Sequence, residues 1–377
     1  MDTNQIYQLV NAVNQEAFGA QALSVKDTAG LVSLGNTILS SNTNTEAFLN
    51  TLVQRIGRTI ISYRRYRSKL ADMVRDDFEW GAILQKIRVH MPEAEADESY
   101  GLVDGQSVDH YKIAKPEVQQ KFFVTRSPYQ FHVTIQKVHL KEAFLSESSM
   151  GAFLGAVTGQ VRNAMEVTLE NLGRITLANM AAEVSNPSNP GLGRVYSLVS
   201  MYNQFAQPSE ALTPDTAMFV PAFLAYAMQI INETIDGFQE LGSYYNIDSI
   251  ETFTPKEMIR VKVVSPFVRA AETVLQYRAF NEELVSIDSA YQKLAFWQNP
   301  DAPMSISIKR ASDGTEISMP NVIAMVHDRD ALGMYREEEE VATTPINAAG
   351  LYYNTYYHAK QLWFNDLSEN FVVFTLD

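Results

Sequence analysis

The sequence contains no cysteine. This absence excludes thiol nucleophiles, thiolate metal sites and disulfides together, and it agrees with a reducing compartment. Positive charge is also scarce, because 30 Lys and Arg residues stand against 44 Asp and Glu residues, for a formal net charge of -14. Such a chain repels a phosphate backbone, so the charge balance argues against a protein that recognises a nucleic-acid sequence.

Long hydrophobic runs are missing as well. The longest extends from Ala217 to Ile231, is interrupted by Pro221 and Gln229, and is too short for a membrane span. We predict a buried strand-turn-helix there and no membrane partner. The first residues lack the basic start and apolar core of a signal peptide, so we expect no export by that route.

Catalytic motifs are absent too. The six histidines are scattered, and none forms HExxH or pairs with a nearby carboxylate at helical spacing. His132 and His139 have opposite parities in a strand-like run, so a regular strand would point them apart. No GxSxG occurs, which leaves a nucleophile-elbow hydrolase unsupported. We therefore assign no catalytic residue, no cofactor and no metal ligand.

Two motifs give only weak signals for a ligand site, and we interpret both as structural. Asp328 and Asp330 of HDRD could hold a divalent cation, but two carboxylates after a strand more often belong to a solvated turn. PGLGRV contains Gly191 and Gly193 but lacks a third glycine and a Lys-Ser/Thr pair, so it is a poor phosphate cradle.

Glycines spaced four residues apart in a helical region also favour a structural role. For Gly151, Gly155 and Gly159 we expect close packing against a neighbouring strand, since glycine inside a helix costs about 1 kcal/mol and needs a packing reason.

The N-terminal third divides into an arm, a helix and an extended excursion. Residues 1–46 are rich in small and polar residues, show no sustained hydrophobic face and predict an arm. Thr43 and Glu46 have capping-box spacing and predict a helix start near Thr43, with one buried stripe. The alternation in residues 129–136, YQFHVTIQ, predicts a half-buried strand.

Two opposite charge clusters flank the start of this excursion. The basic cluster consists of Arg55, Arg58, Arg64, Arg65, Arg67 and Lys69, and the acidic cluster has Glu93, Glu95, Asp97 and Glu98 as its principal members. Complementary patches of this kind can join one copy of a chain to the next, so these ten residues are our candidate intersubunit contacts. Solvated faces remain an alternative, and the basic cluster could instead touch nucleic acid.

The rest of the chain predicts a long helix, an α/β lobe and an aromatic tail. Apolar residues three or four apart indicate one continuous helix from about Ser146 to Val184, with an apolar stripe of about eight turns that ends at Ile175. Residues 195–340 alternate helices and strands. In the strand LYYNTYYHAKQLWF, aromatic residues occur at both parities, so we expect both faces to be covered.

The order of these pieces resembles the major capsid proteins of tailed phages and herpesviruses, which share the Johnson fold. Several short sequence segments are more closely similar to the major head protein of the small Bacillus podophages of the phi-twenty-nine group. The likeness lies in AFLNTLVQRIG (47–57), FHVTIQKVHLKEAFLS (131–146), VIAMVHDRDALGMY (322–335) and, most of all, GLYYNTYYHAKQLW (350–363).

The resemblance implies an α+β fold with a long spine helix, an extended loop, and peripheral and axial domains. By it, 1–46 would be the N-terminal arm, 47–70 a helix leading into the peripheral domain, 71–137 the extended loop, 138–195 with 340–377 the peripheral domain, and 196–339 the axial domain. The sequence up to Asp377 shows no immunoglobulin-like domain of the kind that some relatives carry, so we expect no decoration by such a domain.

The implied function is a major capsid protein that self-assembles, as pentamers and hexamers, into an icosahedral or prolate phage head. The resemblance also implies a scaffolding protein, a portal and packaged double-stranded DNA that is met by non-specific proximity, with the virion as location. The acidic net charge agrees, since an inner surface that repels DNA lets the genome slide. Alternatives are an encapsulin-like nanocompartment and, from another class, an α/β enzyme that uses HDRD.

Overall fold

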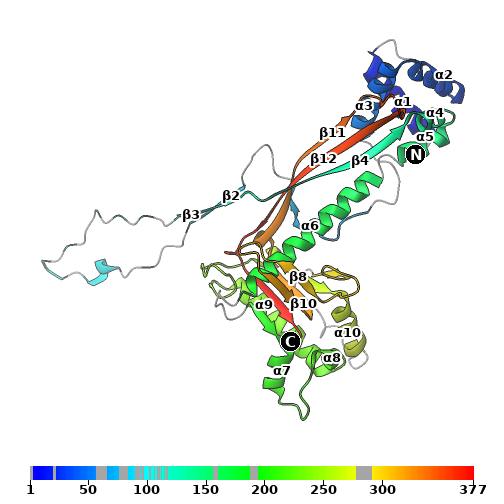
Figure 1. Cartoon of the computed structure of the whole chain (residues 1–377). Helices are drawn as coiled ribbons and strands as arrows, with labels where there is room; N and C mark the ends of the chain where they lie inside the picture. The colour runs from blue at the N-terminus through cyan, green and yellow to red at the C-terminus, as the bar shows by residue number, and fades with distance from the viewer. Residues whose placement is uncertain are drawn as a thin grey trace.

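The chain forms an elongated body from which one hairpin projects (Figure 1). The computed structural model describes residues 3–19, 23–56, 66–75, 84–89, 118–155, 160–186, 194–276 and 291–377, together with scattered positions between 94 and 115. A cluster of short helices holds the N-terminus at one end, and a mixed lobe holds the C-terminus at the other. A long sheet and helix α6 connect the two ends.

The N-terminal cluster packs five helices around a separate hydrophobic core. Its helices are α1 (Thr3–Phe18), α2 (Thr28–Leu39), α3 (Asn42–Ile56), α4 (Lys137–Ala143) and α5 (Glu147–Leu154). Asp27 caps α2 by accepting a hydrogen bond from the Gly30 N–H at 2.7 Å. Gly35 of α2 lies so close to Phe144 that any larger side chain would collide with it.

The expectation that residues 1–46 lack a sustained hydrophobic face was wrong. α1 buries Ile6, Val10 and Val13 in this core, and α2 adds Leu31 and others. The apolar stripes are present, but each helix has only three or four turns, so they close a core only with α4 and α5 from far along the chain. The predicted start of α3 near Thr43 is confirmed within one residue.

The connecting sheet has four strands in the order β1-β11-β12-β4. Its strands are β1 (Val74–Arg75), β11 (Leu332–Thr343), β12 (Tyr352–Asn365) and β4 (Arg126–Gln136). β1 runs parallel to β11, and the other neighbours are antiparallel. Exposure alternates along β4, which confirms the predicted half-buried strand. α6 (Gln160–Val184) lies along this sheet (Figure 1).

The predicted full coverage of the aromatic strand β12 was wrong over most of its length. Its odd-numbered residues from Tyr353 to Gln361 are buried, whereas the even-numbered residues from Tyr352 to Lys360 are half-buried or exposed. One face therefore packs inward and the other meets solvent, as in most antiparallel sheets. Aromatic residues on the outer face stack on one another, as His132 and Tyr356 do at 4.7 Å between ring centroids.

The single long helix also differs from its prediction. α5 ends at Leu154 and α6 begins at Gln160, with residues 156–159 outside the described part. The predicted stripe splits between cores, because Met150 packs in the N-terminal cluster and Leu169 in the lobe. Ile175, which we expected on the stripe, is 46% exposed.

Two smaller expectations about this region were also wrong. His139 lies in helix α4 and not in a strand, so the parity argument for His132 and His139 does not apply. Gly151 approaches Ile6 of helix α1 and not a strand. Gly159 lies outside the described residues.

The lobe is built on a five-stranded sheet with the order β5-β13-β10-β6-β7. Its strands are β5 (Val195–Ser197), β13 (Phe371–Thr375), β10 (Val322–Asp328), β6 (Ile259–Val264) and β7 (Tyr291–Leu294). Its helices are α7 (Leu198–Ala206), α8 (Pro214–Ala217), α9 (Pro221–Gln239) and α10 (Ser265–Gln276). A separate hairpin pairs β8 (Ile306–Lys309) with β9 (Glu316–Met319). All seven residues of β10 are buried, as expected for a central strand.

Two features of the lobe differ from the sequence-based expectations. Residues 217–231 form the end of α8, a turn and then α9, which starts at Pro221, so the predicted strand-turn-helix lacks its strand. The predicted boundary at residue 340 would place β13 outside the lobe, whereas β13 is hydrogen-bonded between β5 and β10. Among the described residues, no helix is long and apolar enough to span a membrane.

Candidate assembly surfaces

A two-stranded hairpin projects from the body of the molecule (Figure 1). β2 (Leu84–Val89) pairs antiparallel with β3 (Val118–Phe123), and the two strands project away from the body (Figure 1). Exposure alternates along both strands. Because alternate side chains point to opposite faces, the hairpin has one face that contacts the body and one that faces solvent.

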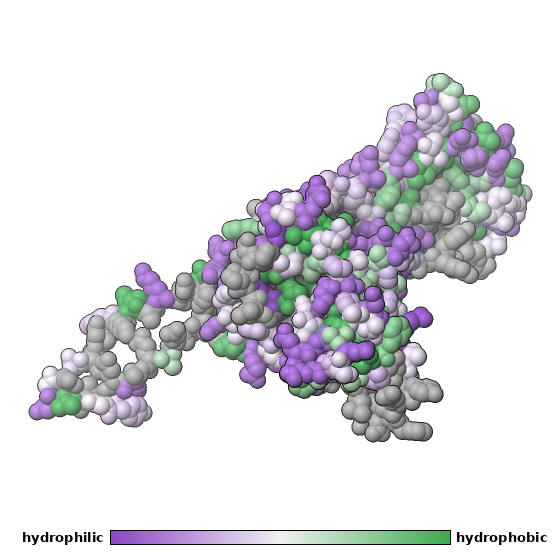
Figure 2. Space-filling model, turned by 60° about the horizontal axis from the view of Figure 1, so that its bottom comes forward, coloured by the Kyte–Doolittle hydropathy of each residue, from purple (hydrophilic) through white to green (hydrophobic). Residues whose placement is uncertain are grey.

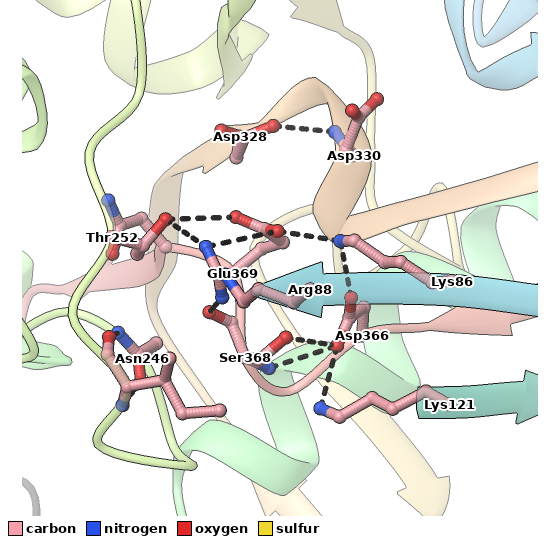
Figure 3. A network of polar contacts seen from close by, with 12 residues as sticks. Lys86, Arg88, Lys121, Asn246, Thr252, Asp328, Asp330, Asp366, Ser368 and Glu369 are labelled. Carbon is pink, nitrogen blue, oxygen red and sulfur yellow. Dashed lines mark hydrogen bonds and ion pairs between the residues drawn. The ribbon is translucent and has the colours of Figure 1, made fainter. Parts of the chain in front are cut away.

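The body-facing side of the hairpin carries cations that pair with the loop before β13 (Figure 3). Lys86 Nζ lies 2.5 Å from Asp366 and 2.6 Å from Glu369. Lys121 contacts Asp366 at 2.9 Å and also pairs with Asp248. Arg88 donates a hydrogen bond to the Ser368 carbonyl at 3.1 Å. It also donates a hydrogen bond to Thr252 and forms an ion pair with Glu369. We call this group of contacts the hairpin anchor.

Burial makes the hairpin anchor strong. The Asp366 side chain is fully buried. Burial alone would raise the pKa of its carboxyl, but the charges of Lys86 and Lys121 and the hydrogen bonds from Lys86 and Ser368 together outweigh burial and lower that pKa to about 2. Burial alone would lower the pKa of Lys86, yet Asp366 and Glu369 outweigh it and raise that pKa. The two groups therefore stay ionised at neutral pH and hold the hairpin base in one position.

Two further ion pairs connect the start of the excursion to the lobe. Asp72, in the 3₁₀ turn η2 (Ala71–Met73), pairs with the buried Lys262 of β6. Arg75 of β1 pairs with Asp330 at 2.6 Å. Burial lowers the pKa of Lys262, which shows how much its charge depends on this partner.

The HDRD motif has a structural role here. The Asp328 carboxylate accepts a hydrogen bond from the Asp330 N–H at 2.7 Å and caps the 3₁₀ turn η7 (Arg329–Ala331), while Asp330 binds Arg75. His327 is buried, stacks on Phe371 and bonds the Asp328 carbonyl through Nδ1. Within the described residues, no three His, Asp or Glu side chains gather as metal ligands would.

The solvent-facing side of the hairpin carries four apolar residues beside Gln85 and Gln120. Ile87, Val89, Val118 and Phe122 are each between 50% and 57% exposed. Further out, Tyr100 and Tyr111 are 92% and 87% exposed. Figure 2 shows hydrophobic and hydrophilic residues interspersed on this projection. An exposed apolar face of this kind is typical of a surface that another chain covers.

Three members of the two predicted charge clusters have described side chains, namely Arg67, Lys69 and Asp97. Arg67 and Lys69 are exposed beside α6, where the Lys69 N–H donates to Glu170. Asp97 is exposed next to the 3₁₀ turn η3 (Glu98–Gly101), which contains Glu98, at the far end of the projection (Figure 1).

Other predicted contact residues cannot be placed in the same way. Arg55 lies in the last turn of α3, without a described side chain. Five more lie outside the described residues, namely Arg58, Arg64, Arg65, Glu93 and Glu95. Gly191 and Gly193 of the glycine motif lie outside them as well.

Sequence reasoning missed the hairpin anchor. Lys86 and Arg88 alternate with Gln85 and Ile87, which indicates a strand with one cationic face. That signal could have identified the cations. Their partners could not be found, because Asp366 lies about 280 residues further along, in a turn whose position depends on the whole sheet.

Comparisons with known proteins agree with this architecture. The family model described as Phi29-like phage major capsid protein matches residues 10–375. The major capsid protein of Bacillus phage B103 is 23% identical over 171 residues, covering 44% of this chain and 37% of that protein. The major capsid protein of Streptococcus phage Cp-1 is 26% identical over 107 residues, covering 28% of each. The aligned segments thus span about a third of the curated relatives' length.

Solved structures show the same fold. A chain of the capsid of Staphylococcus phage Andhra superposes with a TM-score of 0.55 at 10% identity, covering 85% of this chain and 87% of that one. A chain from the structure of the head fiber and inner core protein gp22 of native bacteriophage P68 gives 0.53 at 10% identity, with the same coverage. The expected Johnson fold of tailed-phage capsid proteins is thereby confirmed.

Proposed function

Because the chain belongs to the family of Phi29-like phage major capsid proteins, we propose that it assembles with copies of itself into the shell of a phage head. In this proposal, pentamers and hexamers of the chain close around double-stranded DNA in the virion. Family membership favours this structural role over the enzyme alternative, and a phage head over an encapsulin-like compartment.

The observation that carries the proposal is the anchored hairpin with its uncovered apolar face. A two-stranded hairpin is marginally stable by itself in water. Here the hairpin anchor fixes its base, while Ile87, Val89 and Phe122 stay exposed. A rigid projection that offers apolar surface is suited to lie over an adjacent copy, which would remove that surface from water at about 25 cal/mol per Å².

Each domain then has its own role in assembly. We assign the projecting part of residues 71–137 to the overlap with a neighbour. The four-stranded sheet and α6 form the peripheral domain, and the lobe forms the axial domain around the symmetry axes. Since β13 is central in the lobe sheet, residues 371–375 join the axial domain in this assignment.

Charge supports the same arrangement. Arg67 and Lys69 lie exposed on the body and Asp97 on the projection, so a hairpin from one copy can bring acidic groups to the basic cluster of the next. The net charge of -14 suits an inner wall that meets packaged DNA without binding its sequence. A scaffolding protein and a portal complete the proposed set of partners.

An assembly test follows from the register of the hairpin. Ile87 pairs with Gln120 and Gln85 with Phe122, so the two glutamines share the exposed face with four apolar residues, of which Ile87 and Phe122 lie directly opposite them. The double variant Ile87→Ser/Phe122→Ser should stay folded, because both side chains are exposed, but should lose shells in sedimentation and negative-stain microscopy. The matched control Gln85→Ser/Gln120→Ser should assemble as the unmodified chain does. Normal shells from the first variant would overturn the proposal.

A further inference from the structure

Two long stretches of the lobe contain no charged side chain. Residues 195–209, which include β5 and α7, and residues 216–232, which include the N-terminal part of α9, have no Asp, Glu, Lys, Arg or His, although charged residues make up 20% of the whole chain. Figure 1 shows α7 at the end of the lobe that lies away from the N-terminal cluster. Charged side chains are depleted at the centres of protein interfaces, so this end of the lobe has the composition of a contact surface.

Two aromatic side chains, one from α7 and one from α9, stack on this surface. The ring centroids of Phe205 and Tyr226 lie 5.5 Å apart, with an interplanar angle of 20°. Phe205 is nevertheless 76% exposed, so most of its ring meets solvent. Tyr202 of α7 packs edge-on against Tyr226, with ring centroids also 5.5 Å apart. Because these rings restrain one another, a partner can cover Phe205 with little loss of side-chain entropy.

Small and uncharged residues share the exposed face of α9 with Tyr226. Ala222, Ala225 and Gln229 are exposed, and their spacings of three and four residues place them on one side of the helix with Tyr226. The two alanine side chains let another element approach the helix closely. We call Phe205, Tyr226 and these three residues of α9 the lobe surface. It offers one projecting aromatic ring beside a low helix face.

The charge of the chain indicates which partner fits the lobe surface. Each copy has a formal net charge of -14, so two copies repel each other in general. At an uncharged surface, two acidic copies can meet without placing like charges opposite each other. The charged residues that border the two stretches, Glu210, Asp215 and Glu233, are exposed and can remain in solvent at the rim. Asp377 bonds the Ser200 N–H in the first turn of α7, whereas the aromatic stack involves the last turn.

We propose that the lobe surface packs against the lobe of a second copy of the chain, with Phe205 as the side chain that contributes most to binding. This inference rests on the proposed function, because it names the lobe residues through which copies in a shell meet. The contact is separate from that of the hairpin, so each contact can be removed without the other.

The test measures self-association of the full-length chain by sedimentation velocity over a range of concentrations. It starts from Ile87→Ser/Phe122→Ser, in which the hairpin contact is weakened and the lobe contact remains. This variant should form small oligomers. Adding Phe205→Gln should weaken their association by about thirtyfold, as the loss of an aromatic hot-spot residue does. Adding Ala225→Glu instead, which places a negative charge in the contact, should also weaken it.

The matched control is Phe253→Gln, which removes a lobe aromatic residue that is 49% exposed and lies outside the two uncharged stretches. It should leave self-association unchanged, and circular dichroism checks that every variant is folded. The inference is overturned if the starting variant stays monomeric, or if Phe205→Gln and Ala225→Glu associate as the control does, even when the unmodified chain forms shells. Small oligomers that Phe205→Gln dissociates, from a chain that never forms shells, would support the lobe contact and contradict the proposed function.

Discussion

Replacing Asp366 by asparagine tests whether buried charge holds the hairpin. The pKa of about 2 for Asp366, against an ordinary value of 3.8, corresponds to about 2 kcal/mol of stabilisation at neutral pH. Breaking a buried ion pair can cost about 3 to 5 kcal/mol. Here Lys86 keeps Glu369 and Lys121 keeps Asp248, so we expect the lower figure of about 2 kcal/mol.

The assay is amide hydrogen exchange of β2 and β3 at neutral pH. A loss of about 2 kcal/mol predicts exchange that is about thirtyfold faster in Asp366→Asn. The matched control is Glu316→Gln, which breaks the exposed pair between Lys309 and Glu316, 3.4 Å apart, and should change exchange by less than about threefold. If the two variants exchange alike, buried charge does not hold the hairpin and the reasoning fails.

The pH dependence of the same contact has a definite sign. Because the folded pKa of Asp366 is depressed, its stabilising effect is fully present above about pH 4 and is lost as the pH falls toward 2. The hairpin amides of the unmodified chain should therefore lose protection over that range, and those of Asp366→Asn should change less.

Three further predictions concern other parts of the molecule. Arg67→Glu reverses an exposed charge of the basic cluster, so it should lower shell yield in sedimentation without changing the melting temperature. Gly35→Ala, which collides with its neighbour in the helical cluster, should destabilise the chain by about 1 to 3 kcal/mol in urea unfolding, whereas Gly242→Ala, in open space, should not. Burial and the nearby positive charge of Lys262 lower the pKa of His327 to about 4. The stability of the chain should therefore fall as the pH drops from about 6.5 toward 4, because the unfolded state then binds a proton that the folded state does not. His327→Gln should make the stability depend less on pH over this range.

Regular, local patterns allowed much of the fold to be predicted. Residues 195–340 were predicted to alternate helices and strands, and within them the apolar runs of β10 and β6 are short and contain β-branched residues, as is typical of buried strands. β4 was identified from strict alternation. The helix α9 was found from its spacing of apolar residues, although its start at Pro221 was taken for a turn after a strand.

Features that depend on distant segments could not be predicted. The helices α1 and α2 have short stripes, and their core exists only because α4 and α5 return to it. The outer face of β12 is rich in tyrosine, yet no element of the described chain covers it fully. Aromatic content alone does not show which face of a strand is buried.

The candidate site was predicted in part. Charge clustering singled out Arg67, Lys69 and Asp97 as candidate intersubunit contacts; all three are exposed, and their contact with another copy stays a prediction. The pairing of Lys86 with Asp366 depends on a loop that the sheet places beside the hairpin. Long-range ion pairs of this kind have no signal in a single sequence.

Photo-crosslinking from the hairpin tests the central claim most directly. A photoreactive phenylalanine analogue in place of Phe122, which is 56% exposed, is irradiated in assembled particles, and the products are mapped by mass spectrometry. We predict covalent dimers that join the hairpin of one copy to the body of another. Links confined to a single chain within assembled particles would contradict the account.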